Sequence, residues 1–210
     1  MKTNLRIAGV RKIIAFFLAV CLCMGVVLEG SMIVAVAEDN TPIYKIMVNR
    51  AANCVTVYAK DNNGEFSVPV KAFVCSCGRE GHETPLGTFK TSNYYQWRLM
   101  VDGSYGHYAV RFNRGIMFHS IPYYTKNAGN MEWEQFNLLG EAASLGCVRL
   151  ACADAKWIYD NCKPGTQVVV YDDLENPGPL GKPTELKIAA DNPMKKWDPT
   201  DTDQESMESG

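Results

Sequence analysis

Alternating apolar and polar residues dominate the chain between residues 43 and 118. Residues 44–49 (YKIMVN) and 54–60 (CVTVYAK) show the period of two that is typical of half-buried strands. The sequence Asp-Asn-Asn-Gly that follows the second run predicts a hairpin turn. Further strands are expected in the apolar runs at residues 66–76, 87–90, 108–112, 115–119 and 166–171.

One later stretch has helical periodicity. Apolar residues between positions 155 and 162 recur at i, i+3, i+4 and i+7, and a Pro-Gly pair ends the run. Many short strands with one late helix predict a mainly β protein. We therefore expect a single compact domain over residues 38–171, built as a β-sandwich or a barrel-like sheet.

The segment between Ser120 and Leu145 interrupts this pattern. It is long, contains an Asn-Ala-Gly-Asn sequence, and carries Tyr123, Tyr124, Trp133 and Phe136. Long loops inside compact domains usually have a function. We expect this segment to form an aromatic lid or substrate wall, with Tyr123 and Tyr124 contacting the substrate.

Both ends of the chain differ from this domain in composition. Residues 1–37 combine basic residues, an apolar run and an Ala-Val-Ala site, which is typical of a secretory signal peptide. An uncleaved membrane anchor is the alternative, although Glu-Gly-Ser interrupts the apolar run before it reaches the roughly 20 residues of a comfortable span. Residues 172–210 hold five of the ten prolines and most of the net negative charge, which predicts a flexible tail.

Charge and cysteine content narrow the possible partners. Residues 38–171 carry 13 basic and 12 acidic side chains without a basic stripe, which argues against nucleic acid as the partner. Six cysteines follow residue 37, namely Cys54, Cys75, Cys77, Cys147, Cys152 and Cys162. An exported location permits disulfides, but the count alone assigns no pairs. No second Cys or His pair completes a usual zinc motif, so we expect no metal.

Cys147 has the most informative neighbours of the six cysteines. Gly146 permits a tight backbone path, so the amides of Gly146 and Cys147 can converge on one oxyanion. Arg149 lies on the same face as Cys147 if the segment is extended. It could stabilise a thiolate, hold a substrate carboxylate, or form an ion pair that fixes the loop. Cys147 itself could instead be a buried or disulfide-bonded residue.

Three histidines are candidates for the base that such a nucleophile needs. His82 lies in a polar loop and is expected at the surface. His107 lies at the entry of a strand, where exposure or a structural hydrogen bond is expected. His119 ends the apolar strand 115–119, where a sheet presents a side chain to a cleft. A single histidine in that position is more often a satisfied core residue.

Several motifs resemble the L,D-transpeptidase catalytic domain family (YkuD type) of bacterial cell-wall enzymes. They occur in the family's order over residues 43–171: TPLGTF (84–89), FHS (118–120), LG (139–140), SLGCVRL (144–150), DAKWIYDNC (154–162) and GTQVVVY (165–171). The resemblance implies that Cys147 is the nucleophile and His119 its general base. It also implies that the Ser120 carbonyl orients the imidazole and that the Gly146 and Cys147 amides form the oxyanion hole.

Two features depart from the family's pattern. Many members have a histidine immediately before the Gly-Cys pair, and this chain has Leu145 there, so any contribution of that second imidazole is absent. The separation of 28 residues between His119 and Cys147 is longer than in compact members. Because the extra residues include the aromatic segment, we expect the fit of the substrate to differ.

The resemblance implies a monomeric, extracytoplasmic enzyme that cross-links peptidoglycan stem peptides without a cofactor. Cys147 would attack the amide before a terminal D-alanine, and an amine on a neighbouring stem would resolve the thioester. An L,D-carboxypeptidase, which resolves the same thioester with water, is one alternative. A catalytically silent wall-binding module is another, although binding alone requires no thiol beside a base. Both enzymatic alternatives require Cys147 to be a free thiol.

Overall fold

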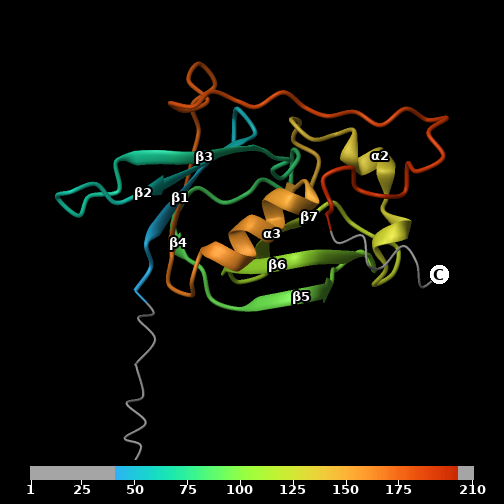
Figure 1. The fold of residues 1–210 in the computed structure, drawn as a ribbon, viewed down its shortest axis with the longest axis horizontal. Coiled ribbons are helices and arrows are strands. Elements are labelled where there is room, and N and C mark those ends of the chain that lie inside the picture. The colour runs from blue at the N-terminus through green and yellow to red at the C-terminus, as the bar shows by residue number, and fades with distance from the viewer. Residues whose placement is uncertain (1–40, 203–210) are drawn as a thin grey trace, which may run out of the picture. The chain divides into compact units, whose positions relative to one another are not determined.

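The computed structural model describes residues 41–202, and its elements form two sheets (Figure 1). The five-stranded sheet has the order β3-β2-β1-β9-β4, with β1 (Tyr44–Asn49), β2 (Cys54–Ala59), β3 (Val68–Val74), β4 (Gly87–Lys90) and β9 (Gln167–Tyr171). The four-stranded sheet has the order β5-β6-β7-β8, with β5 (Tyr94–Leu99), β6 (Tyr105–Asn113), β7 (Ile116–Ser120) and β8 (Val148–Leu150). The helical elements are η1 (Ala128–Asn130), α2 (Trp133–Phe136) and α3 (Cys152–Asn161). The prediction of a mainly β fold is confirmed.

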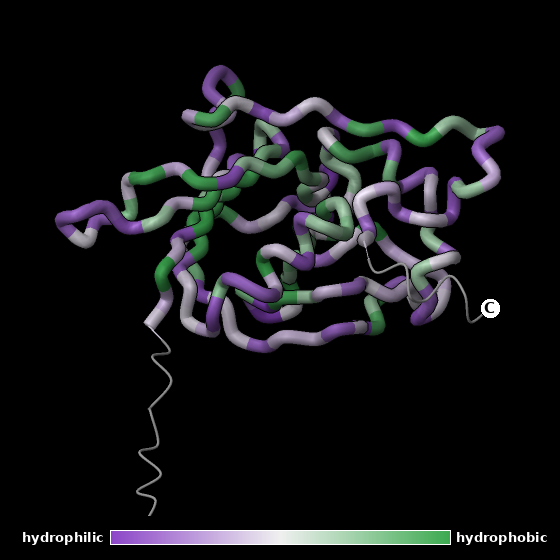
Figure 2. Tube along the Cα trace, in the orientation of Figure 1, coloured by the Kyte–Doolittle hydropathy of each residue, from purple (hydrophilic) through white to green (hydrophobic). Residues whose placement is uncertain are grey.

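The core lies where α3 and the two sheets pack together. Ile46 and Val48 of β1, and Val55 and Val57 of β2, are fully buried. Figure 2 shows hydrophobic positions concentrated along the central strands of the five-stranded sheet. Burial of each such side chain contributes about 1.5–3 kcal/mol. The alternation of β1 therefore reflects one strand face packed against this core.

The segment between Ser120 and Leu145 does not form the expected aromatic lid. Tyr123 and Phe136 are fully buried and belong to a second hydrophobic cluster with Met131. The Tyr123 backbone exchanges two hydrogen bonds of 2.8 Å with Tyr105 at the start of β6, so this part of the segment extends the sheet edge. The expectation of a lid is wrong because these aromatic side chains fill a small core of their own.

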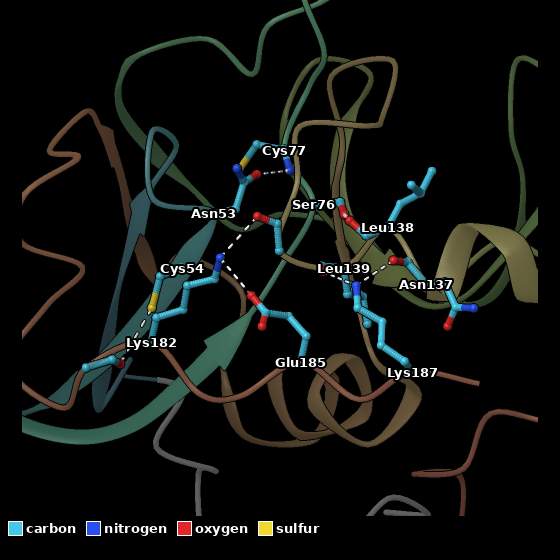
Figure 3. A network of polar contacts seen from close by, with 12 residues as sticks. Asn53, Cys54, Ser76, Cys77, Asn137, Leu138, Leu139, Lys182, Glu185 and Lys187 are labelled. Carbon is cyan, nitrogen blue, oxygen red and sulfur yellow. Dashed lines mark hydrogen bonds and ion pairs between the residues drawn. The ribbon is translucent and has the colours of Figure 1, made fainter. Parts of the chain in front are cut away.

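The C-terminal segment, residues 172–202, lies against the domain rather than forming a flexible tail. Lys187 Nζ donates to the Asn137 carbonyl at 2.6 Å, and the Asn137 side chain exchanges hydrogen bonds of 2.7 and 2.8 Å with the Ile188 backbone. Lys182 Nζ donates to the Gly140 carbonyl and pairs with Glu185 at 2.9 Å (Figure 3). The tail prediction is wrong for these residues because their polar side chains bond to the domain's backbone instead of to water.

The C-terminal segment also caps helix α3. The residue before this helix, Ala151, makes no side-chain cap, although the first amides of a helix lack partners within it. Asp198 Oδ2 accepts a hydrogen bond of 2.9 Å from the Cys152 amide, and Thr200 Oγ1 accepts one of 3.1 Å from the Ala153 amide. Asp198 is fully buried. The caps that α3 lacks locally are thus supplied from 46 residues away.

The expected signal peptide or anchor, residues 1–37, lies outside the described part of the chain, as do residues 203–210. Among the helices of residues 41–202, none has the length and apolar character needed to cross a membrane.

Candidate active site

Two neighbouring parallel strands bring the site residues onto one face. In the register of β7 and β8, Phe118 lies opposite Val148 and His119 lies opposite Arg149. Phe118 and Val148 are part of the core, so His119 and Arg149 face the other way, because strand side chains alternate. Cys147, two residues before Arg149, faces the same side. All three border one cavity of about 340 Å³.

The walls of this cavity come from three connections. They are the β5–β6 connection with the adjoining strand ends (residues 98–104), the β6–β7 connection with the start of β7 (residues 115–117), and the loop that carries Leu145. Tyr123 is fully buried and Tyr124 is 58% exposed, and neither borders the cavity. The expectation that Tyr123 contacts the substrate is therefore wrong. Tyr124 faces solvent outside this space.

His119 has a fixed orientation and a well-defined tautomer. Its Nδ1 lies 2.6 Å from the Ser120 carbonyl, which can only accept, so Nδ1 donates and Nε2 is left as the acceptor. This geometry agrees with the orienting role expected for Ser120. Burial lowers the pKa of His119 to about 4, and Arg149 adds to this effect, while Ser120 and Asp102 oppose it. The imidazole is therefore neutral near pH 7 and can accept a proton.

Cys147 is a partly buried free thiol. Burial raises its pKa, whereas a hydrogen bond from the Met117 amide and the charge of Arg149 act in the opposite direction. The resting pair is thus a thiol and a neutral imidazole rather than two ions. All six cysteines within residues 41–202 are free thiols. Cys147 thus forms no disulfide in this structure, as a nucleophilic role would require.

The loop before Cys147 is held by its own hydroxyl groups. Gly146 has a φ of +115°, and a Cβ atom there would lie 2.9 Å from Ile116 Cδ1. Ser144 Oγ accepts from the Gly146 amide at 3.0 Å and donates to the Cys147 carbonyl at 2.6 Å. Thr84 Oγ1 donates to the Gly146 carbonyl at 2.9 Å. The Gly146 amide, expected in the oxyanion hole, is instead engaged by Ser144 because the left-handed turn directs it there.

Arg149 presents a buried cation to the cavity. Its Nη1 donates to Gln135 Oε1 at 2.6 Å, and it takes part in no ion pair shorter than 4.0 Å with any described residue. Burial lowers its pKa, while the charges of Asp102 and Glu132 raise it. Of the three roles considered for Arg149, a direct ion pair that fixes the loop is not what the structure contains.

The comparisons with known proteins agree with this geometry. The family model of the L,D-transpeptidase catalytic domain (YkuD) matches residues 43–170. The chain belongs to this family. The matched range begins next to β1 and ends within β9, so it includes both sheets and both strands that carry the site.

Named relatives of this L,D-transpeptidase domain share modest identity with it. The putative L,D-transpeptidase YciB of Bacillus subtilis (strain 168) is 44% identical over 55 residues, which is 26% of this chain and 27% of that protein. L,D-transpeptidase 2 of Mycobacterium tuberculosis (strain CDC 1551 / Oshkosh) is 24% identical over 157 residues, 68% of this chain and 32% of that protein. The aligned region thus spans a third or less of these curated relatives. A solved L,D-transpeptidase from Mycobacterium smegmatis superposes with a TM-score of 0.50 at 21% identity, covering 62% of this chain and 59% of the other, which supports the fold.

Gly106 is a residue of this L,D-transpeptidase domain that the sequence analysis did not single out. It lies in β6 beside the His119 imidazole, and a Cβ atom there would stand 2.9 Å from both Cγ and Nδ1 of His119. The same Cβ would also press on the flexible end of Met100. No local sequence signal marks this glycine, because its neighbour is 13 residues away in the chain.

The other two histidines lie outside the cavity. His82 is exposed, as expected. His107 is 5% exposed in the interior of β6, where its ring stacks on Trp97 with a centroid distance of 3.9 Å. Of the two expectations for His107, exposure at a strand entry is wrong. His119 is therefore the histidine that borders the same cavity as Cys147.

Proposed function

We propose that this chain is a peptidoglycan L,D-transpeptidase that forms cross-links through a thioester on Cys147. The proposal rests on three side chains that border one cavity. A free thiol, a neutral imidazole fixed by the Ser120 carbonyl, and the buried cation of Arg149 face the same space. Nucleophilic catalysis by cysteine requires this combination of a thiol and an oriented base.

In the first step, the Cys147 sulfur attacks the amide carbonyl between the third stem residue and the terminal D-alanine. His119 Nε2 accepts the thiol proton as the carbon–sulfur bond forms. The Cys147 amide and Arg149 stabilise the oxyanion. Because the pKa of His119 is about 4, the imidazolium is a strong acid and passes its proton to the departing amine of D-alanine. The carbon–nitrogen bond then breaks and leaves the thioester.

In the second step, an amine of a neighbouring stem attacks the thioester. His119, again neutral, accepts a proton from that amine as the new amide bond forms. The carbon–sulfur bond breaks, and the Cys147 sulfur recovers its proton from the imidazolium. The chain's own residues supply every proton transfer, so the proposed reaction uses no cofactor.

The charges around the cavity favour a substrate that carries carboxylates. Arg98, Arg111 and Arg149 border it, against the single carboxylate of Asp102. A stem peptide presents the carboxylate of its terminal D-alanine and can be held by a guanidinium in a bidentate fashion. We propose accordingly that the chain acts on stem peptides of the cell wall outside the cytoplasm, as a monomer.

Incubation with a purified disaccharide-tetrapeptide tests this function. Mass spectrometry should find a dimer that lacks one D-alanine, together with an acyl-enzyme at Cys147. The Cys147→Ala variant should give neither product. A tripeptide monomer as the main product would identify a hydrolase and contradict the transfer step. Absence of any acylation of Cys147 would contradict the enzymatic function altogether.

A further inference from the structure

A second group of chemically active side chains lies on the opposite face of β6 from His119. Because Gly106 faces His119, the next residue, His107, points away from the cavity toward α3. Its Nδ1 lies 3.9 Å from the Sγ atom of Cys152, the first residue of α3. Asp201 of the C-terminal segment joins them, and one ligand atom from each of the three lies within 4.8 Å of the others. All three side chains are buried.

We propose that His107, Cys152 and Asp201 form a structural zinc site. An imidazole nitrogen, a thiolate sulfur and a carboxylate oxygen are the three donor types that zinc takes in proteins. Tetrahedral zinc with ordinary bond lengths holds sulfur and nitrogen about 3.6 Å apart. The observed separation of 3.9 Å between Cys152 Sγ and His107 Nδ1 needs only a small closure.

A further buried carboxylate lies next to this group. Asp198 is fully buried next to Cys152 and forms no ion pair with a Lys or Arg of the described residues. The Tyr123 hydroxyl is buried beside the Cys152 thiol. A divalent cation would offset the charge of the Asp198 carboxylate, and Cys152 would bind it as the thiolate.

The imidazole is held rigidly in the orientation that a ligand requires. Its ring lies between Trp97 and Tyr108, at centroid distances of 3.9 and 3.7 Å, with interplanar angles of 6° and 19°. Tyr108 has a φ of +51° inside a strand, a strained backbone conformation that persists only where surrounding contacts impose it. The His107 amide donates to Ser120 Oγ at 2.9 Å, which fixes the backbone as well.

The location of the three ligands assigns the metal a structural role. One comes from β6, one from the start of α3 and one from the C-terminal segment, so zinc would tie the segment to the domain. The ligands are buried and face away from the cavity that holds Cys147. Zinc at this position would therefore stabilise the fold without touching the reacting atoms.

Cobalt substitution tests the site. The full-length chain with Cys147→Ala, which removes the reactive thiol, is purified with reductant, stripped with a chelator and titrated with Co²⁺. We expect one equivalent to bind, with a thiolate-to-cobalt charge-transfer band that Zn²⁺ abolishes. Cys152→Ser should remove this band. Cys162→Ser is the matched control, since Cys162 follows the other end of α3, is equally buried and should leave the band intact.

The Asp201→Asn variant tests the zinc site even if Cys152→Ser does not fold. It preserves the size of the side chain and should weaken Zn²⁺ binding by at least about tenfold, measured by competition with a chromophoric chelator. The melting temperature of the parent protein should rise with Zn²⁺, and that of the Asp201→Asn variant should rise less. A parent without the charge-transfer band would show a hydrogen-bonded cluster that holds no metal. An Asp201→Asn variant with unchanged Zn²⁺ affinity would show that zinc binds without Asp201, which would overturn the proposed site.

Discussion

Replacing Gly106 by alanine should disable the active site without altering any residue that reacts. The added Cβ would stand 2.9 Å from Cγ and Nδ1 of His119, whereas ordinary contacts of this kind are 3.4–4 Å. The imidazole must therefore retreat by at least about 0.5 Å, which disturbs the 2.6 Å contact of its Nδ1 with the Ser120 carbonyl. A misplacement of about 1 Å can cost about 100-fold in rate, so we expect acylation to slow by about 10- to 100-fold.

The assay is the rate at which a carbapenem acylates Cys147, followed by intact-protein mass spectrometry at neutral pH. Carbapenems are a suitable probe because the family resemblance implies sensitivity to this class of β-lactam. The variant should remain folded, since overpacking of this size costs about 1–3 kcal/mol. Its melting temperature, measured in the same buffer, separates a displaced imidazole from a lost fold.

Two further variants test whether the contact with His119 causes the slower acylation. Gly115→Ala adds a Cβ on the border of the same cavity where nothing lies within 4 Å, so its acylation rate should match that of the parent. The double variant Met100→Ala/Gly106→Ala relieves the contact with Met100 and leaves the contact with His119, so it should stay slow. A parental rate in Gly106→Ala, or recovery in the double variant, would refute the steric reasoning.

Three other outcomes follow from the site and its supports. Cys147→Ser should lose acylation at an unchanged melting temperature, because a hydroxyl has a far higher pKa than a thiol; His119→Ala should acylate slowly and partly recover at high pH, where hydroxide replaces the base. In the parent, acylation should decline near pH 4, the pKa of His119, and a decline centred on its ordinary value of 6.5 would contradict the buried neutral imidazole. The same lowered pKa makes the fold less stable as pH falls from 6.5 toward 4, because the unfolded chain then binds a proton that the folded chain excludes. Urea unfolding at several pH values measures this loss of stability. Asp198→Ala should lower the free energy of unfolding by about 1–2 kcal/mol through loss of the Cys152 cap, whereas Asp191→Ala, at an exposed position of the same segment, should not.

Strands with one buried face were predictable from local pattern. β1 alternates because one of its faces packs on the core, with Ile46 and Val48 fully buried, and the structure places β1 and β2 within a residue of the expected bounds. β5 (Tyr94–Leu99) was not predicted because its side chains are partly or fully exposed on both faces and therefore show no alternation. β8 has only three residues, all buried, which is too short for any period to appear.

The candidate residues of the site could be predicted because they are carried by a sequence motif. Cys147, His119 and the Ser120 carbonyl all take the positions that the family resemblance implies. Gly106 could not be predicted, since its importance depends on a neighbour brought close by strand pairing. Tyr123 was misjudged because an aromatic residue in a loop gives no local indication of whether it faces a cavity or a core.

The C-terminal segment was misjudged for a related reason. Its composition is polar, acidic and rich in proline. Such a chain usually buries too little apolar surface to offset the conformational entropy that ordering costs. Its side chains nevertheless find partners in the backbone of residues 137–140 and at the start of α3. Composition gives the number of polar groups. It does not show whether these groups bond to water or to backbone groups that lie about 50 residues away.

The supply of the α3 caps by Asp198 and Thr200 sets an order of assembly during synthesis. A ribosome adds about 5–20 residues per second, so the 46 residues between Cys152 and Asp198 take about 2–9 seconds to make. Once β9 (Gln167–Tyr171) has been made, both sheets can pair, while the first amides of α3 remain without acceptors until Asp198 follows. A prematurely terminated chain therefore keeps an uncapped helix N-terminus and exposes its second hydrophobic cluster. Chaperones and proteases can recognise both features.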